Sequence, residues 1–549
     1  MQHSLPTASR AATKAITFAS VLGLVSPAWA FSIDTGNPDV DLRFDNTVRY
    51  TLGWRMESPD SRIYHNNHYD ESDLKFDKGD LVQNRVDLLT ELDMSYQRRM
   101  GFRLSAASWY DNAYKDDDVK TWSGSTFDSS YDHNNYSHTT ERYYRGPSGE
   151  ILDAFVFNRF DLGSVPVNVR AGRHTVFWGE GLLFPGHAIS YSQAPIDGRK
   201  AVANPGTETK ELFLPLGQVS AQAQVTSNLS LAAQYFYEWS PTRAPEGGTY
   251  FGNTDFGVAG PDRFPVAPGF DLAHLKEKEP GNSGNWGLAA RYAVDAIDAT
   301  VGLYYRQFDD YNPAGLQIVP GAGGSPLPAG YRFVYVENTK LYGASFTKQV
   351  GTAAVGVDLS YRDGTQLYTE TAGADGKPAI GNTWHLVANS LWLLPSTPIY
   401  DTGVFMAEMA YSRLDKVTHN KNVFTGEGYA ECEGRNKWDG CATKDFVGIA
   451  ANFTPQWLSV YPSIDLSLPI TVNYGVYGNA ASGGGNQGAS TWSVGLTATY
   501  ETNTEVGLRY SDQTAHTKYS DGAVVGGNNP SLVGLTDRGW LALTFKTGF

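Results

Sequence analysis

Apolar and polar residues alternate along most of this chain with a period of two, which is the pattern of β-strands. The longest run covers residues 40–56, where an apolar face that begins with Val40 and Leu42 alternates with a charged face that begins with Asp41 and Arg43. Strands of soluble sandwiches are usually shorter, at about 5–6 residues. A long strand with one apolar and one charged face is typical of a barrel wall between lipid and water.

The same alternation recurs along the chain, and the connections between the runs are alternately short and long. The runs include residues 85–96, 102–111, 167–172, 229–238, 355–362, 464–474 and 491–500. Short turns are predicted near residues 97–101, 162–166, 226–228, 294–298, 349–352, 393–399, 454–462 and 501–504. Long loops are predicted near residues 57–80, 111–150, 177–217, 240–284, 308–330, 363–382, 413–444, 475–490 and 511–537. Short periplasmic turns and long extracellular loops are typical of outer-membrane barrels.

These connections predict an all-β fold, a closed antiparallel transmembrane β-barrel of about eighteen strands. Eight short turns interleaved with nine long loops give that number, and both ends of the chain then lie on the periplasmic side. Sixteen strands is the alternative if one short hairpin is misread. The last run, Trp540–Phe549, alternates to its end and closes on Phe549, and it resembles the assembly signal of outer-membrane barrels.

The N-terminus has the order of a secretory signal peptide. Arg10 and Lys14 precede the apolar run Ala15–Val25, and Ala28-Trp29-Ala30 places small residues at a cleavage site before Phe31. A membrane anchor is the alternative, but the run is shorter than the roughly 20 residues that span a bilayer. We therefore expect residues 1–30 to be cleaved and residues 31–549 to form a single barrel domain.

Composition and charge agree with a barrel and exclude nucleic acid as a partner. Hydrophobic residues are only 41% of the chain while aromatic residues reach 13%, as expected where one residue in two along a strand is apolar. The net charge is −15, and the segment 1–30 contributes only positive charge, so the remainder is more acidic still. Phosphate binding requires a basic surface.

One long segment, Phe177–Gly217, differs from the other loops. It begins with Trp178-Gly179-Glu180-Gly181, is rich in turn-forming residues, and mixes charges of both signs that include Asp197, Arg199 and Lys200. We predict that it folds into the lumen and narrows it, and an ordinary external loop is the alternative. Charged residues of the inward wall, such as Arg49 and Glu408, either form cross-strand ion pairs or line a conduit.

Other chemistry is sparse in the sequence. Cys432 and Cys441 lie in one predicted loop, and an exported chain favours a disulfide between them. No metal site is expected, since two cysteines lack the usual four ligands, and the acidic run Asp116–Asp118 is better explained as a solvated loop than as a calcium site. His385 and Asn389 share a predicted strand face but lack a matching serine, so we expect no catalytic residues, no cofactor and no enzyme activity.

Several motifs resemble a known family. Arg170–Glu180 reads RAGRHTVFWGE, which resembles the R-x-G-R-Q-x-x-x-W-G-E pattern of a proteobacterial family called domain of unknown function 1302, with His174 in place of the usual Gln. Leu152–Phe155, Ala203–Gly206 and Lys340–Gly364 carry further similarity. The resemblance implies an outer-membrane, porin-like protein. Because relatives are often encoded near exporters and lipid-handling genes, it also implies hydrophobic or amphipathic, lipid- or steroid-like cargo and exporter components as partners.

We therefore expect a channel in the outer membrane of a Gram-negative bacterium, in contact with outer-membrane lipid and lipopolysaccharide, for small amphipathic molecules. A porin for small polar solutes and a plugged receptor or structural barrel are the alternatives. The candidate residues of the pore or its constriction are Arg49, Arg170, His174, Trp178, Glu180, Asp197, Arg199, Lys200 and Glu408.

Overall fold

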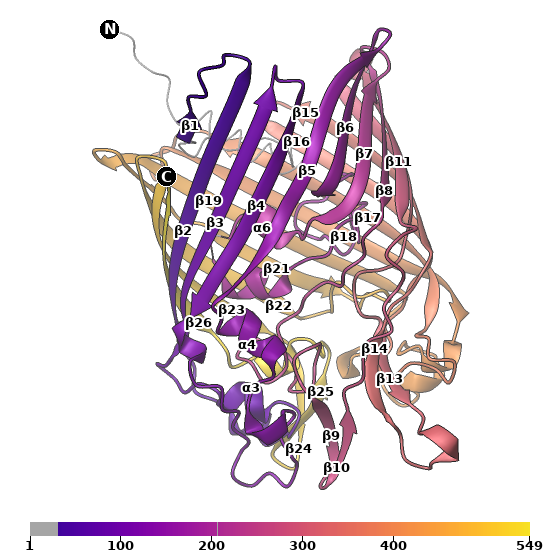
Figure 1. Ribbon diagram of the computed structural model, residues 1–549. Helices are drawn as coiled ribbons and strands as arrows, with labels where there is room; N and C mark the ends of the chain where they lie inside the picture. The colour runs from indigo at the N-terminus through magenta and orange to yellow at the C-terminus, as the bar shows by residue number, and fades with distance from the viewer. Residues whose placement is uncertain (1–30, 206) are drawn as a thin grey trace.

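The computed structural model describes residues 31–205 and 207–549, and these residues form a closed antiparallel β-barrel (Figure 1). The predicted signal peptide, residues 1–30, lies outside the described residues. In the described part of the chain, no helix is long and apolar enough to cross a membrane.

The main sheet contains twenty strand segments. The short β1 only extends the seam beside β2, and β20 and β21 are one strand interrupted at Leu468 and Pro469, so the barrel has eighteen strands, as predicted. Its segments are β1 (Phe31–Ile33), β2 (Val40–Arg55), β3 (Leu81–Tyr96), β4 (Met100–Asp111), β5 (Ser148–Leu162), β6 (Val165–His174), β7 (Leu216–Gln224), β8 (Leu229–Phe236), β11 (Trp286–Val294), β12 (Ala299–Phe308), β15 (Thr339–Val350), β16 (Ala353–Gln366), β17 (Ile380–Leu394), β18 (Thr402–His419), β19 (Asp445–Tyr461), β20 (Ile464–Ser467), β21 (Ile470–Tyr477), β22 (Ser490–Tyr500), β23 (Thr504–Thr514) and β26 (Trp540–Gly548).

Each barrel strand pairs with its neighbour in sequence, and β26 closes the barrel on β2 with Leu543 opposite Leu52. The short turns and both ends of the described chain lie at one end of the barrel, which we call the short-turn end, and the long loops lie at the other (Figure 1). The outer surface is apolar, as the alternation predicted; Leu496, for example, is 47% exposed and Phe545 is 42% exposed.

One predicted turn is shorter than expected. The sequence suggested a turn over residues 454–462, yet β19 continues to Tyr461 and only two residues separate it from β20. Pro455 lies in β19 opposite the interruption between β20 and β21, where the ladder is already broken, and its carbonyl accepts a hydrogen bond from the Leu468 amide at 3.0 Å. Pro469 has no N–H and interrupts the next strand, but the register across the break keeps Leu466 and Ile470 on the outer face.

The long loops contain the remaining elements. Three small hairpins project from them, β9 (Arg263–Ala267) with β10 (Phe270–Ala273), β13 (Gly315–Val319) with β14 (Gly330–Val334), and β24 (Thr517–Ser520) with β25 (Ala523–Gly527). The α-helices are α2 (Ser61–Tyr64), α3 (Asp70–Leu74), α4 (His138–Tyr144), α5 (Gly198–Ala203) and α6 (Thr209–Leu212), and the 3-10 turns are η1 (Asn112–Tyr114), η2 (Asp132–Asn134), η3 (Asp295–Ile297), η4 (Ala322–Gly324), η5 (Lys421–Val423), η6 (Ala430–Cys432), η7 (Lys437–Asp439) and η8 (Val533–Leu535).

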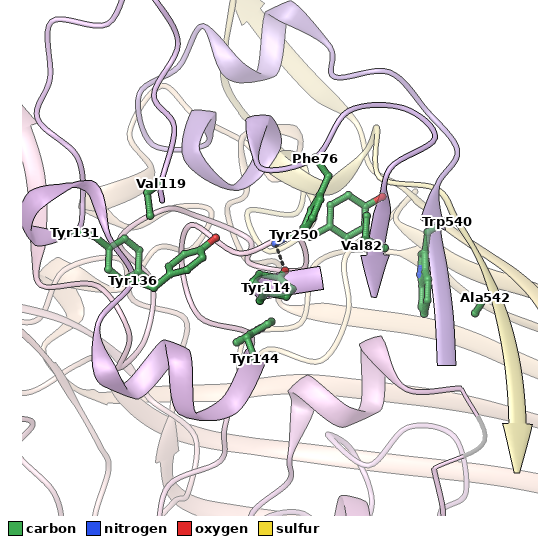
Figure 2. Packing of buried hydrophobic residues seen from close by; sticks show 10 residues of the cluster. All are labelled: Phe76, Val82, Tyr114, Val119, Tyr131, Tyr136, Tyr144, Tyr250, Trp540 and Ala542. Carbon is green, nitrogen blue, oxygen red and sulfur yellow. Dashed lines mark hydrogen bonds between the residues drawn. The ribbon is translucent and has the colours of Figure 1, made fainter. Parts of the chain in front are cut away.

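Three of these loops pack into a common aromatic core at the long-loop end. Tyr114, Tyr136 and Tyr250 are buried together there, and the Tyr250 amide donates to the Tyr114 hydroxyl at 3.2 Å (Figure 2). The core continues to Trp540 at the start of the last strand. The loops therefore cover part of this end of the barrel as a packed layer.

Candidate functional site

The segment between β6 and β7 lies inside the barrel, as the sequence predicted. We call it the lumen segment (residues 175–205 and 207–215). It is bound to inward-facing side chains on strands far from its own position in the wall, including Glu408 on β18 and Arg49 on β2. It therefore crosses the lumen to β18 and returns to the other wall before it enters β7.

Two carboxylates of the wall hold the first half of the lumen segment by its backbone. Glu408 accepts hydrogen bonds from the amides of Leu182, Leu183 and Phe184 at 2.5–2.8 Å. Asp358 on β16 accepts three more amides in the same way, at 2.9–3.2 Å. Those donors are the amides of Glu180, Gly181 and Ile189. Charge-assisted hydrogen bonds of this kind are roughly twice as strong as neutral ones.

Two arginines bind the carbonyl groups that follow. Arg306 on β12 donates to the carbonyls of Ile189, Tyr191 and Ser192 at 2.6–3.0 Å. Arg362 on β16 donates to the Ala188 carbonyl at 3.2 Å. The wall therefore satisfies both the donors and the acceptors of an irregular backbone, which would otherwise be costly to bury.

The second half of the lumen segment is held by ion pairs to the opposite wall. Lys200 of α5 lies 3.2 Å from Glu150 on β5, and Glu211 of α6 lies 3.2 Å from Arg49. Asp197 caps α5 by accepting from the Lys200 amide at 3.1 Å. These contacts place α5 and α6 against the wall on the β2–β5 side.

The structure brings most of the predicted candidates together around the lumen segment. Eight of the nine are at most 8% exposed and face other protein groups more than open space, and all of these except His174 attach the segment to the wall or to neighbouring loops. These eight are Arg49, His174, Trp178, Glu180, Asp197, Arg199, Lys200 and Glu408. Arg170 is the exception and is half-buried on the inner face of β6. A role of any of the nine in controlling passage stays a prediction.

His174 does not reach the lumen segment by a hydrogen bond. Its Nε2 pairs with the Ser220 hydroxyl at 2.7 Å, and its Nδ1 lies 3.0 Å from the Gly172 carbonyl. Trp178 is buried against Tyr304, with ring centroids 6.2 Å apart. His174, where the chain departs from the family-like motif, therefore joins β6 to β7 within the wall.

The sequence did not identify the most important contacts, since these involve backbone groups. Asp358, Arg306 and Arg362 were recognisable as inward-facing, but nothing in their spacing showed that they bind main-chain atoms. His385 and Asn389 also serve the lumen segment. His385 Nδ1 lies 3.0 Å from His187 Nδ1, and the Asn389 amide donates to the Glu180 carbonyl at 2.5 Å.

The lumen is filled unevenly along its length. On β2, the inward side chains change from exposed at Arg43 to buried at Thr51 and Arg55. On β7, which runs the other way, Gln218 is buried and Gln222 is exposed. The short-turn half of the barrel is therefore open to water, and the half nearer the long loops is filled.

Aromatic side chains face the open half beside positive charge. Phe155 and Phe157 on β5 point inward and are half-buried, and the Arg170 guanidinium lies 5.6 Å from the Phe155 ring centre. Leu182 and Met406 are also half-buried, near the Glu408 end of the lumen segment. This part of the lumen offers apolar contacts and a cation to a solute.

Buried acidic groups lie in the loops at the long-loop end. Burial, followed by the charge of Asp255, raises the pKa of Asp70 to about 8. Burial, followed by the charge of Asp73, raises the pKa of Asp537 to about 7. Arg55 at the end of β2 lies 2.6 Å from Asp73 and 3.1 Å from Asp537, so this cluster ties the loops to the rim of the barrel.

Cys432 and Cys441 form a disulfide within the loop between β18 and β19, with an S–S distance of 1.98 Å. Among the described residues, no group of three or more His, Cys, Asp or Glu side chains is arranged to hold a metal ion.

Comparison with known proteins gives one match by sequence and several by shape. A model of the family described as "Protein of unknown function (DUF1302)" matches residues 11–549. No curated protein matches the chain. Similar solved structures include Pseudomonas aeruginosa OpdK with vanillate (TM-score 0.40, 8% identity, 92% of this chain and 98% of that chain) and Acinetobacter baumannii OccAB1 (TM-score 0.42, 10% identity, 92% and 96%). A BenF-like porin from Pseudomonas fluorescens Pf-5 is similar to the same degree (TM-score 0.41, 9% identity, 92% and 98%). The barrel fold is established here by the strand pairing itself.

Proposed function

The chain belongs to the DUF1302 family, and from its barrel and lumen we propose that it is an outer-membrane channel of a Gram-negative bacterium for small amphipathic molecules. The short turns then lie in the periplasm and the long loops outside the cell. The apolar outer face supports the membrane location, because only helices and closed barrels satisfy all backbone groups in lipid. Export by a cleaved signal peptide is part of this proposal.

One observation carries the proposal, the position of the lumen segment. It narrows the half of the barrel nearer the long loops and leaves the periplasmic half open, in the arrangement of a constriction above a periplasmic vestibule. Besides hydrogen bonds and ion pairs, apolar contacts hold the segment, since Trp178, Phe184 and Ile189 are buried in clusters with side chains of the wall. This favours a fixed constriction that selects solutes by their size and by the groups that line the remaining opening.

The cargo class is supported by what faces the open half. Phe155 and Phe157 offer apolar and aromatic surface, and Arg170 lies beside them. Small-molecule sites are commonly lined by such surfaces with a few placed polar groups. A molecule with an apolar body and a polar or anionic end would match this lining better than a small polar solute.

A plugged receptor is the second candidate, and the packed loops at the long-loop end favour it. Tyr114, Tyr136 and Tyr250 are each at most 6% exposed, so this layer excludes water where it lies over the barrel. A barrel closed by such a layer would bind a ligand at the cell surface and pass no ions.

Planar-bilayer conductance separates the two candidates. We expect the purified protein to conduct ions, and we expect deletion of residues 189–210 to raise the conductance several-fold because it removes α5 and part of the constriction. A barrel that inserts but conducts nothing before and after the deletion would contradict the channel. Uptake into proteoliposomes of a fatty acid and of an amino acid then tests the cargo class, and a preference for the amino acid would contradict it.

A further inference from the structure

The guanidinium of Arg362 is buried in the barrel without a carboxylate partner. The residue is 0% exposed, and it forms no ion pair with any described residue. Its Nη2 donates to the Ala188 carbonyl at 3.2 Å, and its guanidinium carbon Cζ lies 3.9 Å from the Tyr191 ring centre. Its Nε and Nη1 make no hydrogen bond within the described part of the chain. A buried charge whose donors make no hydrogen bond is costly unless another group accepts those hydrogen bonds and compensates the charge.

Two hydroxyl groups on the same inward face of β16 are also buried without a hydrogen-bond partner among the described residues. Ser360 precedes Arg362 by two residues and is 1% exposed. After Arg362 the ladder contains a bulge, which places Thr365 opposite Gly381 on the inner side, where Thr365 is 0% exposed. Neither hydroxyl makes a hydrogen bond to a described residue. Ser360, Arg362 and Thr365 therefore form a column of buried donors, which we call the β16 donor column.

The charges around this column do not balance. Arg306, on β12, is a second buried guanidinium, and it also donates only to carbonyl groups. Asp310 is the carboxylate that lies near both arginines, but its oxygens accept from Ser192, Asn312 and the Tyr191 hydroxyl instead. Two guanidinium groups beside one carboxylate leave one positive charge in excess.

Asp358 precedes Ser360 by two residues on the same face, but its oxygens accept backbone amides of the lumen segment, and it forms no ion pair with a described arginine or lysine. The other titratable groups against the column are imidazoles. His385 on β17 is next to Ser360 and is hydrogen-bonded to Thr383 at 2.8 Å and to His187 of the lumen segment at 3.0 Å. Both imidazoles are fully buried beside the Arg362 charge. A neutral or positive imidazole cannot compensate a guanidinium.

We propose that the β16 donor column binds a small inorganic anion, chloride, between the wall and the lumen segment. Chloride accepts hydrogen bonds from N–H and O–H groups in any direction, so it suits a guanidinium flanked by two hydroxyls. Its charge would neutralise the excess of the Arg306, Arg362 and Asp310 group. Because Arg362 and Arg306 bind the carbonyls of residues 188–192, the anion would fix the turn at which the lumen segment leaves the β16 wall. The proposal does not depend on the identity of the cargo.

Diffraction from crystals of the wild-type protein grown in bromide tests the site directly. We expect an anomalous peak in contact with Arg362 and with the hydroxyl of Ser360 or Thr365. A water molecule or no density at this position would overturn the proposal. The same protein should unfold at a higher temperature in sodium chloride than in sodium isethionate of equal ionic strength, since isethionate is too large for a buried column. Equal midpoints would also overturn it.

Variants separate this site from general salt effects. R362Q should unfold at the same temperature in both salts, because its side chain carries no charge. R509Q is the matched control: Arg509 faces the lumen, donates to the Ser493 hydroxyl at 2.7 Å and forms no ion pair with a described residue. R509Q should keep the chloride effect. If R362Q does not fold, S360A combined with T365V keeps the arginine and should raise the chloride concentration for half-maximal stabilisation at least tenfold; an unchanged concentration would contradict the proposal.

Discussion

Glu408 accepts hydrogen bonds from three successive amides of the lumen segment, and a carboxylate is suited to this because both of its oxygens accept. A glutamine at this position has one accepting oxygen and presents an NH₂ group to the remaining amides. The function of the side chain in the structure therefore depends on its charge and on its second oxygen. Asp358 on β16, two strands away from Glu408 on β18, also accepts amides of the lumen segment.

We predict that Glu408→Gln loosens the constriction. At least one buried amide loses its acceptor, which costs about 1–3 kcal/mol of stability. Single-channel recordings should show a larger or more frequently fluctuating conductance. Glu505→Gln is the control, since Glu505 faces the lumen opposite Lys546 and makes no hydrogen bond to the lumen segment within the described residues. An unaltered conductance in E408Q, or an equal change in E505Q, would argue against a specific role of Glu408 in holding the lumen segment.

A second prediction at this scale concerns pH. The pKa of Asp70 is raised in the folded protein to about 8, from the ordinary value of 3.8, so the folded loops bind a proton that the unfolded chain releases. The loop packing is then most stable at low pH, loses stability as the pH rises from about 4 to about 8, and changes no further above that.

Hydrogen exchange of the segment Ser61–Phe76, corrected for the intrinsic rate, measures this effect. Protection should fall between pH 5 and pH 8 in the wild type and fall much less in Asp70→Asn. Asp116→Asn changes an exposed side chain and should behave as the wild type does. A pH response that survives in D70N would show that other groups control it.

At the level of elements, the loops are organised by two different kinds of constraint. The lumen segment is held by non-covalent contacts to several strands, whereas the loop between β18 and β19 is closed on itself by the Cys432–Cys441 disulfide. The bridge spans a separation of nine residues. A cross-link of that size acts locally, by reducing the freedom of the unfolded loop.

We predict that Cys432→Ser with Cys441→Ser destabilises this loop and leaves the barrel intact. Loss of a cross-link that closes a loop of about ten residues corresponds to roughly 2.5 kcal/mol in the chain-entropy model. Amide exchange of residues 420–444 should accelerate, while exchange in β2 and β26 stays the same. Slow exchange of this loop after removal of both cysteines would mean that its packing alone suffices.

For the whole molecule, the two faces of each strand have opposite surroundings. Leu496 and Thr497 are neighbours on β22, but Leu496 lies on the exposed outer face and Thr497 lies opposite Gly507 on the inner face. The outer face meets lipid in the proposed location. A charge therefore has a very different free energy at these two adjacent positions.

We predict that Leu496→Arg destabilises the barrel in a bilayer by about 2–4 kcal/mol, as expected for an arginine on the lipid face near the midplane. Thr497→Arg places the same charge in the lumen and should cost much less. Reversible unfolding from lipid vesicles with a chemical denaturant measures both. Equal free energies of unfolding for the two variants would contradict the assignment of the faces.

The sequence by itself determined the barrel. A period of two assigns each strand residue to one face, and the spacing of turns gives the strand number, because both signals are local and recur along the whole barrel sequence. It also indicated that Phe177–Gly217 differs from the other loops, and that Arg49 and Glu408 face inward.

Only the tertiary structure decided what those inward charges bind. Glu408 meets Leu182 across 226 positions of sequence, and Asp358 meets Glu180 across 178. Their partners are backbone amides, which every residue carries, so no residue pattern could identify them. The unpaired guanidinium of Arg362 is likewise invisible in the sequence, since charge balance depends on which side chains the closed barrel brings together.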